Sequence, residues 1–214
     1  MRGSMLGVHV GLKPVLIQEY NETFELIVVE ITVANSVMRV ITGYGPQENW
    51  DKCLKTPFYN ALEEEIAAGE LEGRSIIVAL DANAKLGSNY IPGDPYPQSE
   101  NGKILSGLIE RHALCVVNGL EDKRKGIITR EKKTVTGVKK SVIDFVIVSN
   151  DLVKHIEQIH IDDERIHVLT ANMKSKNYIH HSESDHNLIN TKLKLTWTPY
   201  KSKVVEVFKY KSKE

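Results

Sequence analysis

Two polar side chains with catalytic potential, Asp81 and Asn83, directly follow an uninterrupted apolar run at 76–80. Such a run between turn signals predicts a buried strand, which would deliver both side chains to the rim of the core. Because side chains alternate along a strand, residues two apart share one side of the chain. A carboxylate can hold a hard cation or handle a proton, and a carboxamide can orient a phosphate oxygen or a water. The alternative is a strand that simply ends in a turn, where Asp and Asn are common.

Three further ionisable residues lie in comparable positions. Asp144 lies within the apolar run 141–149, where a lone carboxylate needs a cation or several donors because burying it bare is costly. Asp185 and His186 come just before the last apolar run, 188–197. A carboxylate beside an imidazole raises its basicity and fixes its tautomer, and clustered carboxylates suit a cation such as Mg²⁺. Structural roles are the alternative: the pair could cap the last strand, and Asp144 could accept bonds from buried backbone amides.

The elements that would position these residues mix strands and helices without a strict strand–helix–strand rhythm. One helix is predicted with Thr56 as its N-cap and Pro57 at its first position, ending near Gly69, and a second over 103–112. The region 162–183 reads as a polar, His-rich connection. Strands are predicted at 24–34, 37–43, 76–80, 113–117, 141–149 and 188–197. This order favours a layered α/β fold with mixed or antiparallel sheets.

Charge is balanced overall but unevenly distributed. The 214 residues include 28 basic and 28 acidic side chains, and 41% are hydrophobic, which suits one globular domain. Segment 121–140 carries eight Lys or Arg against three acids. Such a local basic stripe can bind phosphates even on a neutral chain, and a solvated loop is the equally weighted alternative.

Composition also bears on the compartment and on the domain limits. No apolar run approaches the roughly 20 residues of a membrane span, and no secretory signal is visible. Two cysteines without metal-ligand spacing favour a reducing, intracellular location, cytoplasmic or nuclear. We expect residues 1–4 to be an added leader, 5–198 to be one domain, and 199–214 to be a basic tail.

The order of the motifs resembles that of the endonuclease/exonuclease/phosphatase superfamily, which includes apurinic-site endonucleases, DNase I and retrotransposon endonucleases. The match is most similar to the retrotransposon type, which segment 100–119 also resembles. The residues that carry the resemblance are Tyr44 and Pro46 (a Tyr-x-Pro strand end), Leu80-Asp81-Ala82-Asn83 (a Gly-Asp-Phe-Asn element), Thr129, Ile143-Asp144-Phe145, and the closing Ser184-Asp185-His186.

This resemblance implies a four-layer α/β sandwich of the DNase I type, with two packed mixed sheets and helices outside. It also implies a role for each motif residue. His186 would act on the scissile phosphate as general base or cationic stabiliser, with Asp144 orienting its ring. Asp81 would handle a proton of the attacking water or the leaving oxygen. The phosphate would be bound by Tyr44, Asn83 and Thr129, and Asp185 would lie on the side of a Mg²⁺ or Mn²⁺ ion.

One departure from the superfamily lies at the N-terminus. Its members begin with a strand bearing an Asn and a strand ending in a metal-ligand Glu, and neither is found before Gly7. The sequence therefore predicts an N-terminally truncated sandwich with an exposed sheet edge. We expect a homodimer contact, a partner chain or the tail segment 200–213 to cover that edge.

The resulting hypothesis is a metal-dependent phosphodiesterase, a DNA endonuclease of retroelement or apurinic type that acts without a membrane partner. The basic segment 121–140 favours DNA over a small phosphate. Two alternatives stay open. One is a phosphomonoesterase that acts on inositol or lipid phosphates, and the other is a catalytically impaired form that only binds nucleic acid.

Overall fold

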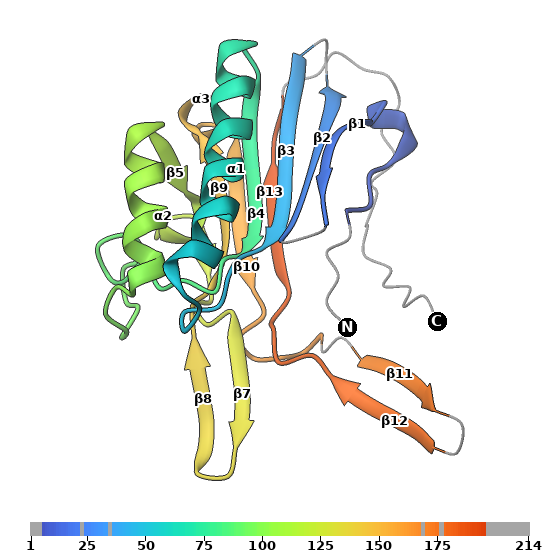
Figure 1. Ribbon diagram of the computed structural model, residues 1–214, viewed down its shortest axis with the longest axis vertical. Coiled ribbons are helices and arrows are strands. Elements are labelled where there is room, and N and C mark those ends of the chain that lie inside the picture. The colour runs from blue at the N-terminus through green and yellow to red at the C-terminus, as the bar shows by residue number, and fades with distance from the viewer. Residues whose placement is uncertain (1–5, 22–23, 34–35, 168–169, 176–177, 196–214) are drawn as a thin grey trace.

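Two mixed sheets pack together, and two long helices, α1 (Lys52–Leu71) and α2 (Glu100–Arg111), cover the outer face of the larger sheet (Figure 1). This computed structural model describes residues 6–21, 24–33, 36–167, 170–175 and 178–195. The leader and tail expected at 1–4 and 199–214 lie outside these residues. No helix in the described part of the chain is long and apolar enough to cross a bilayer.

The larger sheet has six strands in the order β1-β2-β3-β4-β9-β5. Only β3 and β4 run parallel, and the other neighbours are antiparallel. Its strands are β1 (Val15–Tyr20), β2 (Glu25–Val33), β3 (Ser36–Tyr44), β4 (Ser75–Asp81), β9 (Asp144–Ser149) and β5 (Leu114–Val116). Consequently the C-terminal ends of β3 and β4 and the N-terminal end of β9 meet at the same end of the sheet.

The smaller sheet has three described strands, β13 (Ile189–Leu193), β10 (Ile156–Ile161) and β6 (Arg124–Lys125). Two hairpins extend from the body of the molecule (Figure 1), formed by β7 (Arg130–Thr134) with β8 (Gly137–Ser141) and by β11 (Thr170–Ser175) with β12 (Tyr178–Glu183). The short helices are η1 (Val10–Leu12), η2 (Val117–Gly119) and α3 (Asn150–Val153).

Hydrophobic side chains form a core on each face of the larger sheet. Along β4, Ile76 and Val78 point to the helices, where they meet Phe58 and Leu62 of α1. Ile77 points the other way, to the core shared with β10 and β13. The predicted packing of two mixed sheets with helices outside is thereby confirmed, and the described helices supply the layer on the larger sheet.

Several local predictions differ from the structure. α1 begins at Lys52, so Pro57 lies inside it, and the Thr56 hydroxyl donates to the Lys52 carbonyl at 2.8 Å rather than capping the helix. Strands β1 and β10 were not predicted, and the connection 162–183 contains the β11–β12 hairpin. β1 is one edge strand of the larger sheet and is solvent-exposed within the described residues, with Val15 and Leu16 at 57% and 59% exposure. Because β1 buries neither face, its sequence lacks the amphipathic pattern by which a strand is predicted.

Candidate active site

Three potential site residues form a row across neighbouring strands of the larger sheet. Tyr44 ends β3 and pairs in register with Asp81 at the end of β4. Asp81 in turn pairs with Asp144, the first residue of β9. The sequence placed Asp144 inside its strand, but the residues before it, Val142 and Ile143, form a buried connection from β8. Because the strand starts at Asp144, the Asp144 carboxylate lies at the same end of the sheet as the Asp81 carboxylate.

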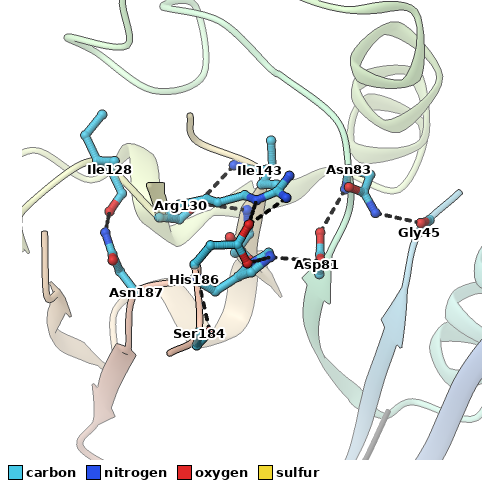
Figure 2. A network of polar contacts seen from close by, with 12 residues as sticks. Gly45, Asp81, Asn83, Ile128, Arg130, Ile143, Ser184, His186 and Asn187 are labelled. Carbon is cyan, nitrogen blue, oxygen red and sulfur yellow. Dashed lines mark hydrogen bonds and ion pairs between the residues drawn. The ribbon is translucent and has the colours of Figure 1, made fainter. Parts of the chain in front are cut away.

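His186 lies between the two carboxylates of this row, and Figure 2 shows it beside Asp81. Its Nδ1 is 2.9 Å from Asp144 Oδ1, and its Nε2 is 3.6 Å from Asp81 Oδ2. The Nδ1 contact is a hydrogen bond that fixes the ring and its tautomer. Nε2 therefore faces Asp81 and makes no hydrogen bond to any of the described residues.

The backbone around His186 is held from both sides. Arg130 and His186 form an isolated antiparallel bridge, and the Asn187 N–H donates to the Thr129 carbonyl at 2.7 Å. On the other side, Ser184 Oγ accepts a bond from the His186 N–H at 3.1 Å. These bonds pair the segment after β12 with the start of β7, and this pairing fixes the backbone that carries the imidazole.

Thr129 supports Asp144 from inside the protein. Its side chain is fully buried, and its hydroxyl accepts bonds from the N–H groups of Ile143 and Asp144 at 2.9 and 3.1 Å. Those two N–H groups lie at the start of β9, and the hydroxyl satisfies donors that would otherwise be buried without a partner. Its geometry suits a positioning residue, whereas the sequence placed Thr129 on the substrate phosphate.

Asn83 is fixed by an unusual backbone conformation just after β4. Its φ of 44° lies in the left-handed region, which Asn tolerates better than most residues. Its N–H donates to Asp81 Oδ1 at 3.2 Å and its Nδ2 donates to the Gly45 carbonyl at 2.9 Å. The buried Asn101 then donates Nδ2 to the Asn83 and Pro46 carbonyls at 3.1 and 2.8 Å. The two strand ends are therefore tied together, and Asn83 faces the same region as Asp81.

Asp185 is engaged by Arg130. The guanidinium Nε and Nη2 lie 2.8 and 2.7 Å from Asp185 Oδ2, while Oδ1 is 3.7 Å from His186 Nε2. Burial would raise the pKa of Asp185, but the hydrogen bond and charge of Arg130, together with the charge of His186, lower it on balance. Asp185 is thus an anion shared between a permanent cation and the imidazole.

The electrostatics of the cluster bring two groups toward useful protonation states. Burial first, and the neighbouring Asp144 carboxylate second, raise the pKa of Asp81 to about 6. For His186 burial alone would lower the pKa, but the hydrogen bond and charge of Asp144 and the charges of Asp81 and Asp185 raise it on balance. A protonated imidazole and a carboxylic acid that titrates near neutrality can both take part in proton transfer.

The donor set fits a divalent cation. Asp81, Asp144 and His186 each offer a ligand atom, and these atoms lie within 4.8 Å of one another. Asp144 Oδ2 is buried and has no hydrogen-bond partner among the residues that the structure describes. Three carboxylates face one imidazole here, and Arg130 is the cation bound to Asp185. A carboxylate oxygen without a partner and a surplus of negative charge are conditions that a hard cation satisfies.

Sequence reasoning missed the residues that hold this geometry. Arg165, itself at a φ of 55°, donates Nη2 to the Ser184 carbonyl at 2.5 Å and Nη1 to Asn187 Oδ1 at 3.1 Å. Asn187 is buried and donates Nδ2 to the Ile128 carbonyl at 2.7 Å. Arg165 therefore clamps the chain on both sides of Asp185 and His186. Asn187 directly follows the motif and signals this role only weakly; nothing in the sequence marks Arg165.

The comparisons with known proteins agree with this geometry. A family model described as Endonuclease-reverse transcriptase matches residues 38–190, a span that contains Tyr44, Asp81, Asn83, Asp144 and His186. The predicted resemblance is therefore confirmed at the level of the family. A search of curated proteins found no match.

Solved structures share the fold at low sequence identity. The endonuclease domain of TRAS1, a telomere-specific non-LTR retrotransposon, has a TM-score of 0.55 and 18% identity, covering 86% of this chain and 70% of that one. The 3′-5′ exonuclease NExo from Neisseria meningitidis has a TM-score of 0.55 and 14% identity, covering 78% of this chain and 65% of that one. The mannosyl-6-phosphatase Bt3783 from Bacteroides thetaiotaomicron has a TM-score of 0.50 and 12% identity, covering 79% and 56%. The chain thus spans between about half and 70% of these structures.

Proposed function

The chain belongs to the endonuclease/exonuclease/phosphatase superfamily, in the family described as Endonuclease-reverse transcriptase, and from this premise we propose that it hydrolyses phosphodiester bonds in DNA. The proposed activity is that of an endonuclease dependent on Mg²⁺ or Mn²⁺. The observation that carries the proposal is the placement of His186 between Asp144 and Asp81. A phosphodiester needs a positioned proton donor or acceptor and neutralisation of charge, and this cluster offers both.

In this mechanism the imidazole is the cationic partner of the scissile phosphate. Asp144 accepts a hydrogen bond from the Nδ1–H of His186 and stabilises the protonated imidazole. The Nε2–H is then left to donate to a phosphate oxygen. Asp81, whose pKa is raised to about 6, exchanges a proton with the attacking water or the leaving oxygen. Since a general acid–base works best with a pKa near the working pH, Asp81 suits this step better than an ordinary aspartate.

Neighbouring side chains bind and orient the phosphate. We assign that role to Asn83 and Tyr44, because both stand at the strand ends beside Asp81. Thr129 takes a different role from the one expected: its hydroxyl holds the Asp144 backbone, so it is a positioning residue. Asp185 would stabilise the charged imidazole from its other side.

The metal ion is the remaining component. Asp144, through Oδ2, and the ionised form of Asp81 would hold it, and a bound cation would neutralise phosphate charge and acidify water. Two carboxylates leave most of an octahedral shell to water and to substrate oxygens, because Mg²⁺ dehydrates reluctantly. Tight binding of the cation therefore depends on the nucleic acid.

The test is nicking of supercoiled plasmid DNA by purified protein, with and without Mg²⁺ or Mn²⁺. We expect nicking that stops with chelator and that falls by roughly 10²-fold or more in His186→Ala, the scale of a positioned acid–base group. His155→Ala is the matched control, because His155 follows α3 beyond the opposite end of β9. Equal nicking by His186→Ala and the wild type would overturn the assignment.

The same assay separates DNA from small phosphate esters. Activity on DNA should decline steeply with added salt. Protein binding releases cations that are condensed on the phosphates, and this release becomes less favourable as the bulk salt concentration rises. Hydrolysis of a small phosphomonoester would show little dependence on salt. A preference for the small ester with flat salt dependence would favour the phosphomonoesterase alternative.

A further inference from the structure

A cavity of about 320 Å³ opens beside the candidate site. Two of its lining residues, Asn83 and Arg130, belong to that site. Its far wall is the β7–β8 hairpin, which projects beyond the end of the larger sheet (Figure 1). Lys85 and Ser99, the N-cap of α2, form the opposite side. A ligand on Asp81 and His186 would therefore continue directly into this cavity.

The lining of the cavity is strongly basic. Most of its cations already have a partner: Arg130 binds Asp185, Lys140 lies 2.7 Å from Glu131, and Lys85 lies 4.8 Å above the Tyr96 ring. The one lining acid, Glu48, accepts a bond from the Asn101 N–H at 3.1 Å. One carboxylate oxygen of Glu48 is therefore already hydrogen-bonded to the start of α2.

Two lysines in the lining, Lys132 and Lys139, have no hydrogen-bond or ion-pair partner among the described residues. They stand directly opposite each other in the register of the hairpin. Opposed residues of an antiparallel pair point to the same face, so both ammonium groups lie on the face that carries Arg130 and Ser141. Like charges in that position destabilise a hairpin unless an anion lies between them.

We propose that this cavity binds a second phosphodiester group of the same DNA strand, with Lys132 and Lys139 holding its non-bridging oxygens. The proposal rests on the proposed function, since it names the substrate class of that site more closely. A phosphate held beside the reacting one requires a polynucleotide, so the cavity would select a nucleic acid backbone over an isolated phosphate ester. The two lysines act as point charges on the backbone and carry no information on base identity.

The experiment measures DNA binding rather than cleavage, with chelator present. Fluorescence anisotropy of a labelled duplex is followed from about 50 to 200 mM salt for the wild type and for the Lys132→Gln/Lys139→Gln variant. Both lysines hold the same phosphate, and each lost phosphate contact lowers the slope of log affinity against log salt by about 0.9, so the variant should lose about 0.9. The affinities of the two proteins should converge as salt increases.

The matched control is Lys154→Gln/Lys194→Gln, which removes the same charge at the opposite end of the sheets. This control should keep the wild-type slope, and thermal melting of all three proteins checks that each is folded. An equal loss of slope in both variants would show a general effect of net charge and overturn the proposal. An unchanged slope in Lys132→Gln/Lys139→Gln would overturn it as well.

Two further measurements separate this proposal from the proposed function and from a free-phosphate site. The wild type could fail to nick plasmid while Lys132→Gln/Lys139→Gln, but not the control variant, shows a smaller salt dependence of DNA affinity. In that case the cavity binds DNA although the hydrolase assignment fails. If nicking is normal and the slope is unchanged, the cavity proposal fails alone. Calorimetric titration with inorganic phosphate identifies the other source: lysine-dependent phosphate binding together with an unchanged DNA slope would refute a backbone site.

Discussion

Replacing Asp81 by asparagine should stabilise the folded protein at about pH 8 while it abolishes hydrolysis. Asp81 is enclosed at the end of β4, and the Asp144 carboxylate is its register partner. These surroundings raise its pKa from 3.8 to about 6, with burial the larger cause. Asparagine has the same shape, can accept the bond from the Asn83 N–H, and carries no charge.

The size and pH window follow from the raised pKa. A carboxyl that is less acidic in the folded state than in the unfolded chain binds its proton more tightly when folded. The contribution of Asp81 to wild-type stability therefore falls as the pH rises from about 4 to 6 and then stays at the lower value. At 1.36 kcal/mol per pH unit, the full cost at pH 8 is up to about 3 kcal/mol. The attraction between Asp81 and His186 opposes the two causes of the shift and is already contained in the raised pKa of Asp81.

Urea unfolding of both proteins at about pH 4, 6 and 8, with chelator present, measures this difference. The free energies of unfolding should nearly coincide at the lowest pH and separate progressively, with Asp81→Asn the more stable. A difference that does not change with pH, or a variant that is less stable at pH 8, would refute the reasoning. Plasmid nicking should be lost in the same variant, because asparagine cannot exchange the proton.

Three further predictions concern the supports of the site and its metal ion. Arg165→Ala should slow nicking by about 10- to 100-fold through misplacement of His186, and Arg165→Lys should restore part of the rate in the same assay. Thr129→Val should lower the free energy of unfolding by about 1–3 kcal/mol or more, because two buried N–H groups lose their acceptor; Thr129→Ser, measured by the same urea titration, should not. Calorimetric titration with Mg²⁺ in the absence of DNA should show no site tighter than the millimolar range, about 4 kcal/mol of binding, and a micromolar site would mean that the chain supplies a further ligand.

The sequence predicted the elements whose apolar pattern is continuous or regular. β4 was recognised because an unbroken apolar run ends in two polar residues, and the β2–β3 pair because two β-branched runs flank a turn signal. β1 was missed because its side chains are exposed on both faces. β10 was missed because a register shift between Ile156 and Gln158 breaks its alternation.

The site was predictable as a set of motifs but not as a set of contacts. Asp144 reads as the middle of a strand because Val142 and Ile143 are as apolar as the strand that follows. These two residues are buried in the connection between β8 and β9, where the Thr129 hydroxyl accepts the hydrogen bond of the Ile143 N–H. Arg165 and Asn187 meet only after the β11–β12 hairpin returns the chain, so no local pattern could reveal their contact. Long-range supports of this kind are set by topology rather than by spacing.

The row formed by Tyr44, Asp81 and Asp144 makes the proposed nicking activity a reporter of correct strand pairing. The three residues come from distant parts of the chain and stand abreast only in the native register. A slip of one residue in either pairing would turn one of the three side chains to the opposite face of the sheet. During refolding, circular dichroism would count all chains that regain secondary structure, whereas nicking would count only those in register. A lag between the two signals would therefore measure the time that the chain spends in misaligned pairings.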